Sequence, residues 1–284
     1  MTQRRYIIGE EWIYLKVYTG PMTIETILVN NIENKLNQFF LKKIIDKFFF
    51  IRYMDPEYHI RIRLHCANLN YYSQILFEIH KSLHHFVKNL IITKVVWDTY
   101  SRELERYDNN HINLFEDLFY YDSSFILKYL KKTLCSDNER YLVSMKFIDG
   151  ILSSIGMNLD QKLLFTTNSA ESYLNELYRS NSDVKHLLNL KYRKDRTLIE
   201  NCLDTLNSKV WWQVCLHEYL SKASNLLKII FKGKTMELTS IIHMHVNRMF
   251  RTNQRTCELV IYWYLSKYYK SKKAKLKYTH TSKY

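Results

Sequence analysis

Residues 59–65, with the sequence HIRIRLH, alternate charged or titratable side chains with apolar ones. Successive side chains of a β-strand point to opposite faces, so this alternation predicts a strand with Arg61 and Arg63 on one face. Two arginines at this spacing repel each other, and an anionic ligand would offset the repulsion. Arginine binds a carboxylate through two parallel hydrogen bonds, which makes a carboxylate one candidate ligand. A solvated face of an antiparallel sheet is the alternative interpretation, and spacing alone leaves both open.

A second polar cluster spans residues 98–107, DTYSRELERY. Arg102 and Arg106 are four positions apart and share a face if a helix begins here. The two nearby glutamates, Glu103 and Glu105, offer these arginines simple surface partners. The cluster is therefore either part of a site or an ordinary charged surface.

The third cluster, residues 240–248, reads SIIHMHVNR and carries two histidines. On a helix His243 and His245 diverge by about 200°, because each residue turns by about 100°. His243 shares its face with Asn247, whereas His245 lies among apolar neighbours, which favours packing. A zinc site would need histidines at i and i+4 and a third ligand. The spacing does not provide them, so we predict no metal site.

The segment 267–277 interleaves lysine with tyrosine, and no acidic residue follows Glu258. Such basic segments bind nucleic acid or an anionic membrane surface, and many are simply solvated chain ends. The sequence leaves the role of this tail open.

The periodicity of the first third predicts the elements that carry these residues. Aromatic and β-branched runs predict strands, and apolar residues at helical spacing predict helices. From Glu103 onward the period is almost wholly helical, and the predicted helices there include 183–190, 195–225 with a break, and 254–269. The predicted strands are 12–18, 47–53, 59–66 and 90–97, and the helices between them are 23–45 and 71–88. This β-α-β-β-α-β order is that of the ferredoxin-like split pattern. We therefore predict an α+β fold that has an N-terminal antiparallel sheet and a helical C-terminal half. The chain is predicted to form a single domain over 1–284, with an α+β part over 1–110 and a helical part with a basic tail over 111–284.

The composition excludes several functional classes. The chain has 284 residues, 46% hydrophobic and 25% charged, with a net charge of +14, which is typical of a globular protein. With five glycines it contains neither G-x-G-x-x-G nor a P-loop, so nucleotide-binding folds lose their main support. Five cysteines without C-x-x-C indicate reduced thiols. Apolar runs are too short to span a bilayer, and no signal peptide is evident. These features predict a cytoplasmic protein.

Taken in order, the motifs resemble one known family. Residues 12–20, WIYLKVYTG, and 49–63, FFIRYMDPEYHIRIR, are similar to the C-terminal domain of lantibiotic dehydratases, which also stands alone in thiopeptide biosynthesis. The hallmark of that family is F-x-I-R-Y-x-D-P-x-x-H-[IL]-R-[LIV]-R. Residues 100–107, 119–123 (FYYDS) and 243–248 (HMHVNR) resemble its later motifs in family order.

The sequence departs from the family pattern at two places. Asp108 and Asn109 stand where two glycines are expected, which affects the loop after Tyr107. Phe250 and Arg251 stand where a glycine often follows the last motif. The glutamylating domain of full-length dehydratases has no counterpart in these 284 residues, so the resemblance implies a separate glutamylating protein.

The resemblance implies a lyase reaction without cofactor or metal. Full-length members esterify serine or threonine of a precursor peptide with glutamate from glutamyl-tRNA, and the C-terminal domain eliminates glutamate to leave dehydroalanine or dehydrobutyrine. Motif matching carries Arg63, Arg102 and His243 over as the elimination residues. The remaining motif positions are candidate substrate contacts: Arg52, Arg61, Arg106, Asn247 and His245. The resemblance also implies that Asn247 orients His243.

Two other functions stay open at this point. Relatives of the domain close a thiopeptide pyridine ring by [4+2] cycloaddition, although such enzymes tend to lose the elimination arginines that are retained here. A non-catalytic module could instead hold an acidic leader peptide or glutamyl-tRNA for a partner. The expected partners are the precursor peptide and the glutamylating enzyme, with a homodimer left open. No DNA is expected, and membrane contact is at most peripheral.

Overall fold

The computed structural model describes residues 2–107, 110–132, 137–205, 210–231 and 236–281. The chain divides into two compact units. The first comprises residues 1–134 and 233–252, and the second comprises residues 135–232 and 253–284. The first unit thus includes helical segments that the sequence assigned to the C-terminal part. Each unit has its own buried core.

A four-stranded antiparallel sheet forms the centre of the first unit. Its strands lie in the order β3-β4-β2-β5, and all neighbours run antiparallel. The strands are β2 (Trp12–Tyr18), β3 (Ile45–Met54), β4 (Tyr58–Cys66) and β5 (Lys94–Trp97), with a separate pair formed by β1 (Arg5–Tyr6) and β6 (Tyr100–Ser101). The α+β class and the antiparallel sheet are confirmed. The strand predicted from Leu90 begins only at Lys94.

One face of this sheet is aliphatic and is covered by helices. The helices are α1 (Pro21–Ile27), a π-helical turn (Leu28–Ile32), α2 (Glu33–Leu41) and α3 (Tyr72–Lys88). Ile60, Ile62 and Leu64 of β4 are almost completely buried. The ring of Phe40 on α2 packs against Phe48 of β3 with centroids 5.9 Å apart. The helix predicted over 23–45 is helical from Pro21 to Leu41 with a π-helical turn in its middle, and it ends before Ile45, where β3 begins.

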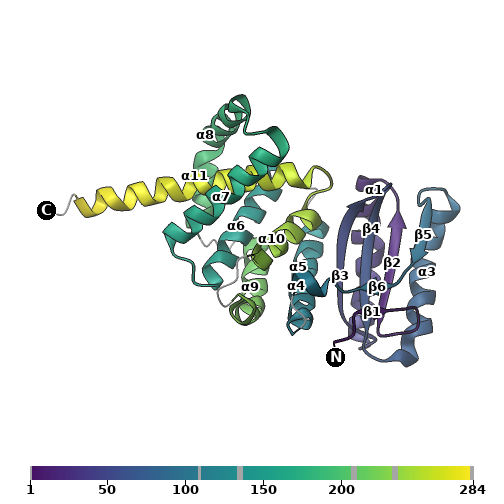
Figure 1. The fold of residues 1–284 in the computed structure, drawn as a ribbon. Helices are drawn as coiled ribbons and strands as arrows, with labels where there is room; N and C mark the ends of the chain where they lie inside the picture. The colour runs from purple at the N-terminus through teal and green to yellow at the C-terminus, as the bar shows by residue number, and fades with distance from the viewer. Residues whose placement is uncertain (1, 108–109, 133–136, 206–209, 232–235, 282–284) are drawn as a thin grey trace. The chain divides into compact units, whose positions relative to one another are not determined.

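The opposite face is aromatic and carries the arginines. Strand pairing sets Tyr14 opposite Arg63 and Phe49 on its other side, so the three share this face. Phe49 packs on Phe119, with ring centroids 5.4 Å apart. Phe119 belongs to α5. The elements at this face and at the β3 edge are α4 (Leu104–Tyr107), α5 (Ile112–Lys132) and α10 (Met236–Met249), drawn beside β3 in Figure 1.

The second unit is helical in its described residues. Its helices are α6 (Asp137–Ser154), α7 (Leu159–Tyr178), α8 (Ser182–Asp204), α9 (Trp211–Ile230) and α11 (Gln254–Thr281). Two sequence predictions fail here. The helices predicted over 183–190 and from Asp195 are one continuous α8, and α11 continues past Tyr269 through the lysine segment. Lysine, alanine and leucine are good helix formers, so the basic segment propagates the helix. No helix in the described part of the chain is long and apolar enough to cross a membrane.

Candidate anion site on the arginine face

A cavity of about 320 Å³ lies within the first unit, on the aromatic face of the sheet. Strands β3 and β4 supply one wall, β6 and α4 supply another, and α5 and α10 complete it. Its lining includes six residues that the sequence had marked: Arg52, Arg61, Arg63, Arg106, His243 and Asn247. The aromatic and apolar part of the wall is formed by Phe49, Ile51, Tyr53, Tyr100, Tyr107, Ile112, Phe119 and Met244.

Arg63 is a buried cation surrounded by aromatic rings. Only 9% of the residue is exposed, and its guanidinium carbon lies 4.6, 5.0 and 5.2 Å from the ring centres of Tyr14, Tyr100 and Phe49. Its buried Nε has no hydrogen-bond partner, and no carboxylate among the described residues pairs with it. Aromatic faces stabilise a cation, but they provide no counter-charge. Burial of an unpaired charge is costly, so Arg63 is prepared for an anion.

Arg61 is held in place by two neighbours on the same face. Its guanidinium lies 3.4 Å from the ring centre of Tyr53, and its Nε donates to Nε2 of His59 at 3.1 Å. His59 accepts at Nε2, so its ring proton sits on Nδ1, which is 2.8 Å from the carbonyl oxygen of Glu57. Burial, with the charge of Arg61 adding to it, lowers the pKa of His59. A neutral His59 therefore orients Arg61.

Arg106 lies at the mouth of the cavity. Its Nε donates to Ser240 Oγ of α10 at 3.0 Å, and its Nη1 is 3.3 Å from Glu103. Both members of the Arg106–Glu103 pair are largely exposed, so this pair adds little stability and can open. Arg106 keeps freedom to turn toward a ligand.

Arg102 does not line the cavity. Its Nε and Nη2 bind the two carboxylate oxygens of Glu116 at 2.7 and 2.6 Å, and both residues are buried. Burial alone would lower the pKa of Arg102, but the bonds and charge of Glu116 outweigh it and raise the pKa. Tyr100 donates its hydroxyl to the same carboxylate at 2.9 Å. Arg102 thus fixes Glu116, which in turn holds a ring that contacts Arg63.

The motif on α10 is fastened to the free edge of the sheet. Strand β3 has no strand on its outer side, and side chains satisfy its backbone groups instead. Asn247 accepts from the N–H of Arg52 at 2.7 Å and donates to its carbonyl at 2.8 Å. Arg248 donates to the carbonyl of Phe50 at 2.8 Å, and Ser123 accepts from the Phe50 N–H at 3.3 Å. These bonds fix the position of α10, and hence of His243, against the sheet.

The Arg52 side chain is committed to the other face. Its Nη2 pairs with Glu25 of α1 at 2.9 Å, and its Nε donates to the carbonyl oxygen of Arg248 at 3.1 Å. The guanidinium is completely buried. Arg52 borders the cavity, but its charge is neutralised by Glu25.

His245 lies behind the cavity in a buried charge cluster. Its Nδ1 is 2.7 Å from one oxygen of Asp122, and the other oxygen of Asp122 accepts from Arg248 at 2.7 Å. Both His245 and Asp122 are buried. Burial alone would raise the pKa of Asp122, but His245 and Arg248 together outweigh it and lower the pKa. The helical face of His245 predicted packing among apolar neighbours, whereas the structure places its ring on the Asp122 carboxylate.

The structure therefore brings together some of the predicted residues and separates others. The six residues that line one cavity are Arg52, Arg61, Arg63, Arg106, His243 and Asn247, although the guanidinium of Arg52 is bound by Glu25. Arg102 and His245 lie outside it. The aromatic residues around the arginines were missed, although Tyr14 could have been placed by its register opposite Arg63. The expected loop change at residues 108–109 lies outside the described residues. Across the described ranges, no group of three or more histidine, cysteine or acidic residues is placed to hold a metal ion.

The fold and the motifs together define a family. The model of the lantibiotic biosynthesis dehydratase C-terminal family matches residues 12–269, and the chain belongs to that family. The match includes every motif that lines or borders the cavity.

The chain is also similar in sequence to a longer relative and in fold to two solved structures. The chain is 28% identical over 287 residues to the nisin biosynthesis protein NisB of Lactococcus lactis subsp. lactis, covering 95% of this chain and 26% of NisB. It thus spans about a quarter of the length of that relative. The fold is similar to that of the tRNA-dependent lantibiotic dehydratase MibB from Microbispora sp. 107891 (TM-score 0.65, 16% identity, 91% of this chain and 28% of MibB). It is also similar to that of the pyridine synthase TbtD from thiomuracin biosynthesis (TM-score 0.54, 14% identity, 90% of this chain and 97% of TbtD).

Proposed function

We propose that this protein is a lyase that eliminates glutamate from glutamylated serine or threonine of a precursor peptide. The observation that carries the proposal is Arg63, a buried arginine at a cavity with no carboxylate partner among the described residues. The leaving group of the reaction is a carboxylate, which is the ligand that a buried, unpaired guanidinium lacks. Family membership supports the same chemistry.

The proposed reaction removes a proton and a carboxylate from neighbouring carbons. A base takes the α-proton of the esterified residue, and the electrons of that C–H bond form the Cα–Cβ double bond. The Cβ–O bond breaks, and its electron pair leaves with the glutamate carboxylate. The product is dehydroalanine from serine or dehydrobutyrine from threonine. The balance requires no oxidant, nucleotide or cofactor.

The cavity residues take distinct roles in this proposal. His243 moves the proton, since a ring nitrogen of an imidazole can accept a proton and donate it again. Arg63 stabilises the departing carboxylate by preorganised charge, often the largest catalytic contribution. Arg61 and Arg106 hold the remaining anionic groups of the substrate. We assign Arg102 a positioning role, because its guanidinium is occupied by Glu116.

The proposed reaction implies partners of defined chemistry. The substrate is a precursor peptide already esterified with glutamate, so a glutamylating enzyme that uses glutamyl-tRNA must act first. We assign that step to a separate protein and place both reactions in the cytoplasm, where glutamyl-tRNA is available. These 284 residues carry the elimination step in this scheme.

The test uses the full chain and a synthetic peptide that carries a glutamyl ester on one serine. Mass spectrometry should show loss of one glutamate and a final mass one water below that of the unesterified peptide. Arg63→Ala should slow this step about a hundredfold or more, the effect expected for loss of one oxyanion-type donor. The matched control is Arg196→Ala, which removes an exposed arginine paired with Glu200. The control should eliminate glutamate at the native rate.

Three other outcomes would replace the proposal. If Arg63→Ala eliminates glutamate as fast as the native protein, the cavity is not the elimination site. If the native protein leaves the ester intact but joins two dehydroalanines of a dehydrated peptide into a ring, it is a cycloaddition enzyme. If neither reaction occurs and the peptide only binds, the chain is a binding module.

A further inference from the structure

A second hollow lies entirely within the second unit, between α7 and α11. Its volume is about 530 Å³. Residues on one stripe of each helix form it, and its floor is apolar, with Leu163 and Ala170 from α7 and Trp263 and Ala274 from α11. Lysines of α11 border this floor. We call this hollow the α7–α11 groove.

The lysines of α11 fall into two groups with different partners. Those facing α8 are paired: Lys272 with Asp204 at 2.7 Å and Lys275 with Glu200 at 2.9 Å. Four lysines of α11 line the groove. Lys273 pairs with Asp160 of α7 at 2.5 Å, whereas Lys267 and Lys270 have no carboxylate partner within the described residues. The groove therefore holds two lysines whose charge no carboxylate of the described residues neutralises.

Lys267 is the more confined of these two lysines. Its ammonium lies 4.9 Å from the ring centre of Trp263. Burial, and then the charges of Lys270 and Arg193, lower the pKa of Lys267. A nearby anion would offset the repulsion that Lys267 experiences from Lys270 and Arg193, so the groove favours an anionic ligand.

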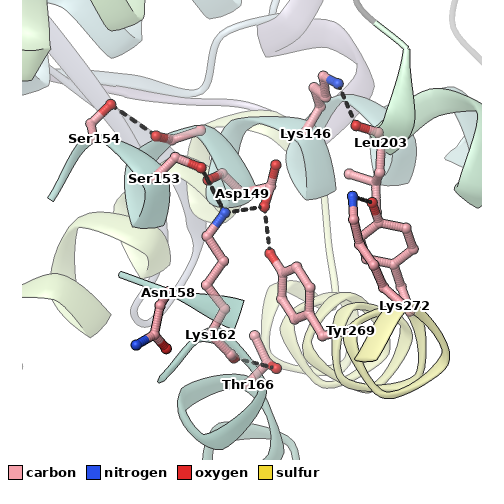
Figure 2. Close-up of polar contacts among 12 residues, drawn as sticks. Lys146, Asp149, Ser153, Ser154, Asn158, Lys162, Thr166, Leu203, Tyr269 and Lys272 are labelled. Atoms are coloured by element: carbon pink, nitrogen blue, oxygen red, sulfur yellow. Dashed lines mark hydrogen bonds and ion pairs between the residues drawn. The ribbon is translucent and has the colours of Figure 1, made fainter. Parts of the chain in front are cut away.

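The groove is held open by contacts on the other side of its helices. Figure 2 shows Asp149 of α6 bound by Lys162 of α7 at 2.6 Å and by the hydroxyl of Tyr269 of α11 at 2.8 Å. Lys162 also donates to Ser153 at 2.6 Å. One carboxylate thus ties three helices together. Because Tyr269 precedes Lys270, this anchor fixes the backbone of α11 next to a groove lysine.

The apolar floor of the groove favours a peptide ligand over a nucleic acid or a membrane surface. A nucleic acid would need an exposed aromatic platform and benefits from arginine. Trp263 is 7% exposed and is covered by Lys267, and the lining contains no arginine. A membrane surface would meet a concave groove poorly. An amphipathic helix matches both features, because its apolar side can enter the groove while acidic side chains reach the lysines.

We propose that the α7–α11 groove docks an acidic amphipathic peptide segment of a partner polypeptide. The groove extends along α11 from Trp263 to Lys277, which is about 21 Å at the rise of a helix, so it accommodates about 14 residues. This proposal stands whether or not the chain eliminates glutamate.

The test measures binding of a fluorescent synthetic peptide to the full chain. The peptide is an amphipathic helix of about 14 residues with leucine on one side and glutamate on the other. Lys267→Glu with Lys270→Glu should weaken binding about tenfold or more, and added salt should weaken binding to the native chain. The matched control reverses two exposed lysines of α9, Lys222→Glu with Lys228→Glu. This control should change affinity less than about twofold, the size of a screened long-range effect.

Two further variants separate docking from general charge or misfolding. Glu171, on the groove lining, faces the same ligand, so Glu171→Lys should tighten binding of the acidic peptide. Ala274→Trp should fill the groove and block binding without changing charge. Circular dichroism checks that each variant keeps its helices. The proposal is overturned if the peptide binds all variants equally, or if only a single-stranded RNA or anionic vesicles show the Lys267 and Lys270 dependence.

Discussion

The side-chain amide of Asn247 pairs with both backbone groups of Arg52, in the way that a neighbouring strand would. The two bonds are 2.7 and 2.8 Å long and join residues 195 positions apart in the sequence. A helix end thereby completes the outer edge of β3. The same helix carries His243 at the cavity, so one contact couples the stability of the sheet edge to the position of a candidate catalytic residue.

Asn247→Ala should loosen this edge. The N–H and carbonyl of Arg52 would lose their partners, and each unsatisfied buried polar group costs about 1–3 kcal/mol. Amide hydrogen exchange of Arg52 should accelerate, and the free energy of unfolding should fall. Asn225→Ala on an exposed part of α9 is the matched control and should leave both unchanged. Unaltered exchange at Arg52 in Asn247→Ala would show that the amide does not hold the edge.

Arg63 and Arg102 should respond in opposite ways to the same substitution. Arg63→Met removes a buried charge without a carboxylate partner, so unfolding free energy should stay equal or rise while glutamate elimination is lost. Arg102→Met leaves Glu116 buried without its partner, which should cost about 3–5 kcal/mol. Denaturant unfolding measures the change in unfolding free energy of both variants, and the mass assay measures glutamate elimination. Equal destabilisation by both substitutions would contradict this division of roles.

Local periodicity was sufficient for most elements near the cavity. The strand over 12–18 and the arginine-bearing strand were placed within a residue because alternation is a strong local signal. The continuity of α8 was missed because polar residues near Lys194 interrupt the apolar pattern of a helix that is half exposed. The length of α11 was missed because its lysines find partners, Asp204 and Glu200, on a distant helix.

The candidate site was only partly predictable, for a different reason. The motifs identify which arginines matter to the family, but they do not say which arginine already has a partner. Glu116 decides that Arg102 is neutralised, and it lies 14 positions away on a helix face whose direction the sequence leaves undefined. In contrast, the sheet face on which Arg63 lies, and which borders the cavity, can be predicted from the alternation of side chains along the strand.

Asp122→Asn should destabilise the first unit in a pH-dependent manner. The folded pKa of Asp122 is lowered, so its carboxylate contributes stability above its ordinary pKa of 3.8, and this contribution is lost as the pH falls through the folded value. The variant should be about 3 kcal/mol less stable at neutral pH, and the difference should shrink as the pH falls below 3.8.

Denaturant unfolding at several pH values measures the difference in unfolding free energy between the native and Asp122→Asn proteins. Hydrogen exchange of β3 amides at the same pH values reports the local part of this difference. Asp183→Asn is the control, since Asp183 is exposed at the start of α8. A difference between native and Asp122→Asn protein that does not change with pH would mean that the carboxylate charge is not the stabilising feature.

His59 should make both stability and elimination depend on pH through Arg61. The pKa of His59 in the folded protein is lowered from its ordinary value of 6.5. As the pH falls through 6.5, the unfolded chain therefore binds more protons than the folded protein, and the protein loses stability. This loss continues until the pH reaches the pKa of His59 in the folded protein. Protonation also turns Nε2 into a donor, which breaks its bond from Arg61.

His59→Gln can still accept from Arg61, whereas His59→Phe cannot. Both variants should remove the pH slope in unfolding free energy, but only His59→Gln should retain elimination. His217→Gln, an exposed histidine of α9, should keep the native slope. Equal elimination by the Gln and Phe variants would show that His59 does not position Arg61.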